Sequence, residues 1–250
     1  MNAVEVGGWL AASGAGCAAA GAWRSLSSRM ETVARACHEL RGPLTAARLG
    51  LELGSSMGEL SPARLRAIDL EIGRAALALD DLETVRSRRL VGARRGLDAV
   101  AVDVAQLLSD SVEAWRASAV ARGVELRSSW SGGEATVWGD RLRLAQATGN
   151  LISNAIEHGG GVVSVRGVVG ARGGRGPGRV RIEVTDTGPG LPASVSELTR
   201  RAQRGRGRRG RGLAIATAVV VGHGGRLAAA PSERGARLVL ELPTVAPPAC

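Results

Sequence analysis

Residues 150–158 decide the fold, and they read Asn150-Leu151-Ile152-Ser153-Asn154-Ala155-Ile156-Glu157-His158. The stretch lies in a predicted helix over residues 140–157. Asn150 and Asn154 are four residues apart, so their side chains project from the same face of that helix. Paired amides beside a phosphate chain can complete an octahedral Mg²⁺ shell that keeps its waters. Alone the pair is a weak signal, because asparagines on a helix surface usually contact only solvent.

A second polar segment follows a predicted strand over residues 180–185. It reads Asp186-Thr187-Gly188-Pro189-Gly190-Leu191. A carboxylate at a strand end can accept a hydrogen bond from an exocyclic amine such as that of adenine. The two glycines let backbone pass close to a flat ring. Without further context the same residues also describe a plain turn.

A third segment opens a predicted helix over residues 212–221 and reads Gly210-Arg211-Gly212-Leu213-Ala214-Ile215-Ala216. Glycines before a helix N-terminus expose backbone N–H groups to phosphate oxygens. The chain between the second and third segments is rich in arginine, from Arg200 to Arg209. We expect this basic stretch to be mobile and to close over a triphosphate.

The surrounding pattern predicts a mixed domain. Strands are expected at 100–102, 124–130, 135–137, 162–169, 180–185, 226–230 and 236–242, with a further helix at 104–121. Residues 162–169 and 180–185 alternate like a β-hairpin. Helices and mainly antiparallel strands in this order predict an α/β sandwich, one helical layer over one sheet.

Upstream, residues 25–53 carry apolar side chains at alternating spacings of four and three. This heptad seam is typical of bundled helices. Ser61-Pro62 predicts the N-cap and first turn of a second helix with the same periodicity. Two antiparallel helices have too small a core to stand alone, so we expect a second copy to complete a four-helix bundle. The fold class is therefore α+β, and a linker is expected around 86–96.

The three downstream segments, in this order, resemble the N, G1 and G2 boxes of the GHKL ATPase domain, the Bergerat fold. The resemblance implies binding of ATP and Mg²⁺, with Asn154 as the principal metal ligand and Asn150 as its helper. It implies Asp186 on adenine, with Gly188 and Gly190 shaping that pocket. It places the remaining G2-box residues at the lid hinge and phosphates, namely Gly210, Gly212 and Leu213.

The first predicted helix contains His38-Glu39-Leu40-Arg41-Gly42-Pro43-Leu44, which resembles the H-box of sensor histidine kinases. His38 lies next to seam residue Cys37, at the flank of the expected bundle. Glu39 can hydrogen-bond the imidazole and raise the nucleophilicity of the other ring nitrogen. Pro43 weakens the helix just after the histidine. The resemblance implies that His38 is phosphorylated from ATP and passes the phosphoryl group to an aspartate of a response regulator.

The expected domains are residues 1–24 as a tail or weak membrane anchor, 25–95 as the dimerisation and phosphotransfer hairpin, and 96–245 as the ATP-binding domain. Two departures from the family pattern stand out. Gly42 occupies the position where the family usually has Thr or Asn, so we expect weak phosphatase activity. The chain has no phenylalanine, and Ala214 replaces a glycine usual in G2.

Composition limits these interpretations. The chain has 250 residues, a formal net charge of +10 and no lysine, so all its basic side chains are arginines. The uncharged stretch 6–23 has the length of a short anchor but is mainly Ala and Gly, which leaves a membrane-tethered segment and a poorly ordered tail both open. Three cysteines without metal-ligand spacing are expected to be reduced thiols on the cytoplasmic side.

Two other functions stay open from the sequence. One is a catalytically degenerate, dimeric scaffold that binds nucleotide, since the lid departs from the family pattern. The other is an arginine-rich nucleic-acid binder. The second is disfavoured because the arginines gather in a glycine-rich lid without aromatic stacking partners.

Overall fold

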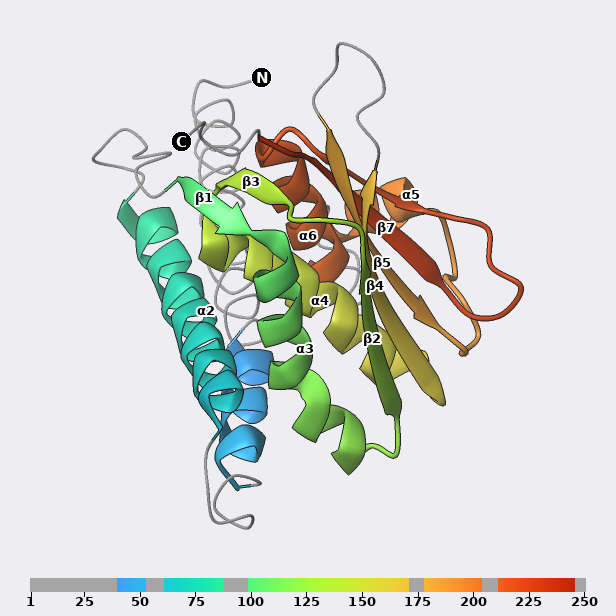
Figure 1. Ribbon diagram of the computed structural model, residues 1–250, viewed down its shortest axis with the longest axis horizontal. Coiled ribbons are helices and arrows are strands. Elements are labelled where there is room, and N and C mark those ends of the chain that lie inside the picture. The colour runs from blue at the N-terminus through green and yellow to red at the C-terminus, as the bar shows by residue number, and fades with distance from the viewer. Residues whose placement is uncertain (1–39, 53–60, 88–98, 171–177, 204–210, 246–250) are drawn as a thin grey trace, which may run out of the picture.

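The computed structural model describes residues 40–52, 61–87, 99–170, 178–203 and 211–245. Five strands form the main sheet in the order β2-β4-β5-β7-β6 (Figure 1). The pairs β4–β5, β5–β7 and β7–β6 are antiparallel, as the predicted hairpin requires, whereas β2 and β4 are parallel. The strands are β2 (Glu125–Ser131), β4 (Val162–Gly170), β5 (Arg179–Asp186), β7 (Arg237–Pro243) and β6 (Arg226–Ala229).

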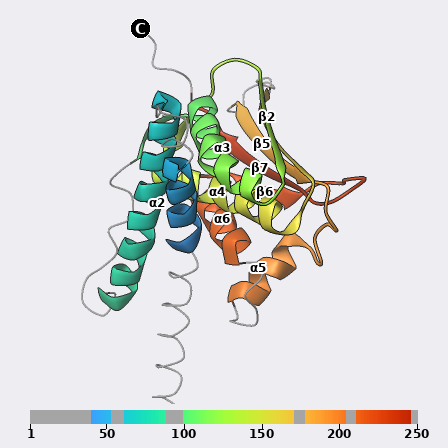
Figure 2. The same ribbon diagram turned by 90° about the horizontal axis from the view of Figure 1, so that it is seen from below.

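One layer of helices covers one face of this sheet, and Figures 1 and 2 show the layer from two sides. It contains α3 (Val104–Ala121), α4 (Arg141–His158) and α6 (Arg211–Gly222). Leu151 and Ile152 of α4 are fully buried, as are the sheet residues Val165, Ile182 and Leu240. Burial of such side chains stabilises the fold by about 1.5–3 kcal/mol each. The predicted α/β sandwich is confirmed.

Aspartate caps fix where two of these helices begin. The Asp103 carboxylate accepts hydrogen bonds from the backbone N–H groups of Ala105 and Gln106, at 2.9 and 3.1 Å. Asp140 accepts from Leu142 and Arg143 at 2.9 and 3.0 Å. Each cap stabilises its helix by about 1 kcal/mol. Asp140 therefore sets the start of the helix that carries Asn150 and Asn154.

A helical hairpin lies on the side of α3 and α4 that faces away from the sheet (Figure 2). It consists of helical residues 40–52 and of α2 (Pro62–Ser87), which contacts both α3 and α4. The backbone N–H of Arg64 donates to the Ser61 hydroxyl at 3.3 Å, so the predicted N-cap is confirmed. Residues 25–39, the segment 6–23 and most of the predicted linker lie outside the described residues.

The heptad seam is divided between two environments. Ala47, Ile68 and Ala75 are buried within the chain. Other seam positions stay about half exposed and recur every seven residues along each helix: Leu44, Leu51, Leu65, Ile72 and Leu79. We call these five residues the apolar stripe.

Two expectations need correction. The start of the basic stretch 200–209, expected to be mobile, is instead helical, because Arg200 and Arg201 belong to helix α5 (Val195–Gln203), while residues 204–209 lie outside the described residues. Ser194 caps this helix through the N–H of Glu197 at 3.2 Å, and Val195, Leu198 and Ala202 bury its inner face. In addition, β1 (Val100–Asp103) and β3 (Thr136–Gly139) form a separate two-stranded sheet instead of extending the main one.

Candidate nucleotide-binding site

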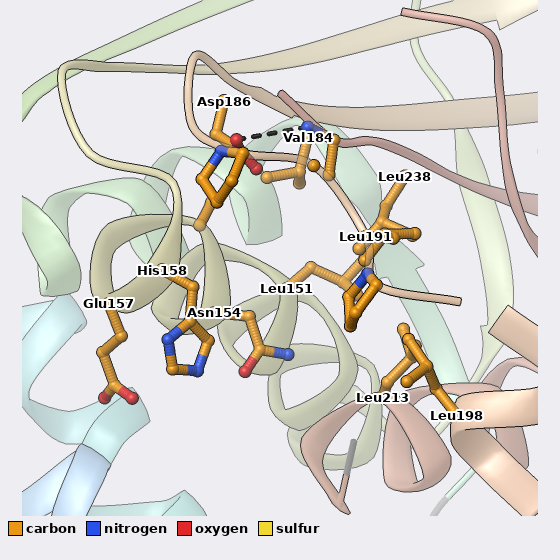
Figure 3. A pocket seen from close by; sticks show the side chains of 15 residues that line it. Leu151, Asn154, Glu157, His158, Val184, Asp186, Leu191, Leu198, Leu213 and Leu238 are labelled. Carbon is orange, nitrogen blue, oxygen red and sulfur yellow. Dashed lines mark hydrogen bonds between the residues drawn. The ribbon is translucent and has the colours of Figure 1, made fainter. Parts of the chain in front are cut away.

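A cavity of about 440 Å³ opens between α4, α6 and the loop that follows β5. Figure 3 shows its lining, with leucines on one side and Asn154, Glu157 and His158 along α4. Its walls are mostly apolar, as expected for a pocket that takes a flat ring. The aliphatic lining residues are Leu151, Val184, Leu191, Leu198, Leu213 and Leu238.

Asp186 lies at the end of β5 and is 8% exposed. Its Oδ1 accepts hydrogen bonds from the backbone N–H groups of Gly188 at 2.9 Å and Ala236 at 3.2 Å. Both bonds go to the same oxygen, and they hold the carboxylate in a fixed orientation. The side chain therefore presents a second oxygen that can accept from an amine in the pocket.

The loop after β5 approaches other backbone segments so closely that only glycine fits. A Cβ on Gly188 would lie 2.2 Å from the carbonyl oxygen of Gly159, just past the end of α4. Gly190 has a positive φ of 82° and closes the turn. The loop and the C-terminal end of α4 are therefore held together by direct backbone contact.

Gly235 provides a test of this packing. Its φ is +67°, and a Cβ there would lie 2.0 Å from the backbone oxygen of Asp186. Gly235→Ala is expected to lower the free energy of unfolding by about 3 kcal/mol, because positive φ and overpacking each cost about 1–3 kcal/mol. Urea unfolding measures this. Gly222→Ala is the matched control, since a Cβ there meets no atom within 4 Å. Equal stability of the two variants would contradict the packing argument.

The two asparagines lie on the same face of α4, as the spacing predicted, and the structure turns this face toward the start of α6. The Asn150 amide donates to the carbonyl oxygen of Gly212 at 3.4 Å. A Cβ on Gly212 would lie 3.4 Å from Asn154 Nδ2 and 3.5 Å from Asn150 Cβ. The structure thus brings the paired amides and the N-terminus of α6 together.

A second cavity, of about 470 Å³, adjoins the first. Asn154, Glu157 and His158 line both. Its remaining lining comes partly from the helical hairpin, which contributes Arg41, Gly42, Pro43, Thr45 and Arg74. The other lining residues lie outside the hairpin: Trp115, Ser118, Arg122, Asn150, Ser153, Gly212 and Ile215. The hairpin therefore forms one wall of a polar space beside the paired asparagines.

His223 supports this site from the other end of α4. Its Nε2 accepts from the backbone N–H of Asp140 at 3.1 Å, and its Nδ1 lies 2.7 Å from the carbonyl oxygen of Val219. Both ring nitrogens are thus engaged, with Nδ1 as the donor. The histidine ties the end of α6 to the cap of α4.

The described site residues are brought together around the two cavities, and Leu213 lines the first of them. His38, Glu39 and Gly210 lie outside the described residues. Sequence reasoning missed Leu198, His158 and Arg74 as lining residues. The capping pattern Ser194–Glu197 could have revealed α5 and with it Leu198. No local pattern could have revealed Arg74.

The side chains at this site can hold a metal ion only if other ligands complete its coordination shell. In the described ranges no group of three or more His, Cys, Asp or Glu side chains could hold an ion. Asn150 and Asn154 offer neutral amide oxygens, which suit a hard cation such as Mg²⁺ when phosphate oxygens and water supply its other ligands. A metal at this site would therefore depend on a bound nucleotide.

Comparison with known proteins agrees with this geometry. Residues 139–246 match the family described as histidine kinase-, DNA gyrase B-, and HSP90-like ATPase. The chain is 30% identical over 226 residues to the alginate biosynthesis sensor protein KinB of Pseudomonas aeruginosa, covering 86% of this chain and 37% of KinB. It is 31% identical over 225 residues to the signal transduction histidine-protein kinase BaeS of Escherichia coli, covering 86% of this chain and 47% of BaeS.

Among solved structures, full-length ShkA in complex with AMPPNP aligns with a TM-score of 0.54 and 26% identity, over 88% of this chain and 46% of ShkA. The chain spans less than half the length of each of these three proteins. Within the part of the chain that the structure describes, no helix is both long and apolar enough to cross a bilayer. Together the family match, the sequence relatives and the geometry of the site show that the chain belongs to the sensor histidine kinases of two-component systems and carries their GHKL-type ATP-binding domain.

Proposed function

We propose that the chain binds Mg·ATP in the two adjoining cavities, transfers the terminal phosphoryl group to His38, and then passes it to an aspartate of a response regulator. Asp186 would accept a hydrogen bond from the adenine amino group, with Gly188 and Gly190 bounding the ring. Asn154 and Asn150 would hold the metal ion. Gly210, Gly212 and Leu213 would contact the phosphates and the base from the start of α6.

One observation carries this proposal: helical residues 40–52, which begin two residues after His38, line the same cavity as Asn150 and Asn154. Arg41, Gly42 and Thr45 face that shared space. The segment next to the proposed acceptor therefore lies beside the proposed phosphate site. Such juxtaposition is what a phosphoryl transfer needs most, because its catalysis depends mainly on positioning and electrostatics.

In the proposed step, the lone pair of one His38 ring nitrogen forms the bond to the γ-phosphorus. The bond from that phosphorus to the β–γ bridging oxygen breaks, and ADP leaves. Glu39 accepts a hydrogen bond from the other ring N–H and so stabilises the positive charge that develops on the imidazole. Magnesium would offset phosphate charge during the transfer.

We further propose that the hairpin pairs with a second copy through the apolar stripe, as a four-helix bundle with residues 25–95 as its domain. The support is the exposure of Leu44, Leu51, Leu65, Ile72 and Leu79, which are 48–54% exposed at heptad-like spacing. A soluble helix normally buries such a face. The ATP-binding domain of the proposal is residues 96–245.

Ile72→Glu is expected to weaken this dimer at least about 100-fold, because two buried, unpaired carboxylates would replace two apolar side chains. Size-exclusion chromatography with light scattering measures the mass across a dilution series. Val120→Glu is the matched control, since Val120 is also exposed but lies on α3. An unchanged oligomeric state in Ile72→Glu would contradict the proposed interface.

Gly42 bears on the reverse reaction. We expect weak phosphatase activity, and Gly42→Thr is expected to speed loss of phosphate from the cognate regulator several-fold by adding a hydroxyl that orients water. A Cβ on Gly42 would lie 3.3 Å from the Trp115 ring, so the ring must shift slightly. Gly42→Ala controls for that contact without the hydroxyl. Equal dephosphorylation rates in the two variants would remove this explanation.

Incubation with γ-labelled ATP tests the proposed function against its rivals. Acid-labile, base-stable label on the wild-type chain is expected. Nucleotide binding without any label would favour the degenerate scaffold. Tight, salt-sensitive DNA binding without ATP affinity would favour the nucleic-acid binder.

The proposal places the ATP-binding part in the cytoplasm, with residues 6–23 as a membrane contact. It includes no nucleic-acid partner.

A further inference from the structure

An ion pair is buried at the hairpin wall of the second cavity. Arg74 and Glu71 of α2 are 3% and 1% exposed. Arg74 Nη1 donates to both carboxylate oxygens of Glu71, at 2.6 and 2.7 Å. Charged side chains are rarely this deeply buried unless they are paired. Even a paired charge loses hydration when it is buried, and apolar side chains would pack the hairpin without this cost, so packing alone does not explain the pair.

The Arg74 guanidinium packs directly against the backbone of α4 at Gly149. A Cβ on Gly149 would lie 2.2 Å from Arg74 Nη1 and 2.5 Å from its Cζ, so only glycine leaves room for this side chain in its present position. The Trp115 ring centroid lies 6.0 Å from Arg74 Cζ. A glycine inside a helix costs about 1 kcal/mol relative to alanine. The space for Arg74 therefore costs helix stability at Gly149, the residue before Asn150.

The pairing with Glu71 leaves Arg74 incompletely satisfied. Arg74 Nε is buried and has no hydrogen-bond partner. Leaving a buried donor unpaired is costly, so a ligand oxygen that reaches it would be bound favourably. Arg74 also lines the second cavity together with Asn150 and Asn154.

The charges around this cavity favour an anion. Its ionisable lining residues are Arg41, Arg74, Arg122, Glu157 and His158, so cationic side chains predominate. Asn154 lines both cavities, so the two cavities adjoin at the paired asparagines. A nucleotide whose base lies against Asp186 in the first cavity would extend its phosphates along α4 toward Arg74.

We propose that Arg74 binds the terminal phosphate of ATP from the hairpin side of the cavity. In doing so it exchanges part of its hydrogen bonding to Glu71 for hydrogen bonds to phosphate oxygens. The inference rests on the proposed nucleotide site. Guanidinium groups suit this role because their planar N–H donors match phosphate oxygens. ADP lacks the terminal phosphate, so ATP would hold the hairpin against α4 more firmly than ADP does.

The test compares the affinities for AMPPNP and ADP by isothermal titration calorimetry on the full chain with Mg²⁺. Glu71→Gln with Arg74→Gln removes the pair without changing the net charge. AMPPNP affinity is expected to fall about ten-fold, as for loss of one charge-assisted contact, while ADP affinity stays nearly constant. The matched control is Arg64→Gln with Glu113→Gln, which removes a pair that joins α2 to α3 (3.5 Å) outside the cavity lining. That control should leave both affinities unchanged.

Glu71→Gln alone gives a result of the opposite sign. Without the competing carboxylate, Arg74 is expected to raise the affinity for AMPPNP relative to ADP, and AMPPNP should increase the thermal stability of this variant more than ADP does. A purely structural pair would change both affinities equally or neither, and either result would overturn the inference. Wild-type chain that binds neither nucleotide would remove the proposed function and this inference together. Wild-type binding with an unchanged AMPPNP-to-ADP ratio in the double variant overturns this inference alone.

Discussion

His38→Gln is expected to abolish labelling from γ-labelled ATP while leaving ATP affinity unchanged. Glutamine keeps a polar side chain of similar reach but has no ring nitrogen that can attack phosphorus. The cavity residues proposed to bind ATP lie in other parts of the chain, namely Arg74 in α2 and the stretch from Asn150 to Leu238. Label retained on the protein after gel electrophoresis and ATP affinity by calorimetry measure the two effects separately.

The chain has only three histidines, which makes the control sharp. His223 has both ring nitrogens engaged, with Asp140 and Val219. His158 is exposed and lines both cavities, so it is the rival acceptor. His158→Gln should therefore keep the label. Label that survives His38→Gln but disappears in His158→Gln would move the acceptor from the hairpin to α4.

Asp186→Asn is expected to lower ATP affinity about 100-fold without unfolding the chain. The asparagine amide oxygen can still accept from the N–H groups of Gly188 and Ala236, so the loop after β5 stays in place. The other carboxylate oxygen becomes an NH₂ donor that faces the adenine amino donor. Loss of one charge-assisted bond costs about 1.5–3 kcal/mol, or roughly 10- to 150-fold in affinity.

The same substitution should change base preference, because an NH₂ group can donate to a ring carbonyl such as that of guanine. The ratio of ATP to GTP affinity is therefore expected to fall in Asp186→Asn. Glu183→Gln is the matched control, since this carboxylate lies on the same strand and pairs with Arg237, at 2.7 Å, away from the first cavity. Unchanged ATP affinity in Asp186→Asn would contradict the assignment of Asp186 to adenine.

Much of the ATP-binding domain could be predicted from local patterns. Helices α3, α4 and α6 and strands β4, β5 and β7 were located within about two residues, because apolar periodicity and capping residues are local properties of the chain. The parallel pairing of β2 with β4 could not be predicted, since it joins segments more than thirty residues apart. Helix α5 was not predicted, because the six arginines within and directly after it obscured its short apolar pattern.

The sequence by itself determined that Asn150 and Asn154 share a helix face, that Asp186 ends a strand, and that a glycine-containing helix start follows. Each of these depends on spacing within a single element. Only the tertiary structure decided that the hairpin packs on α3 and α4. This packing places Arg74 against Gly149, the residue before Asn150. In sequence, a charged pair three residues apart on a helix indicates a solvent-exposed face. Its burial depends on a glycine and a tryptophan from distant helices, and no periodicity within α2 contains that information.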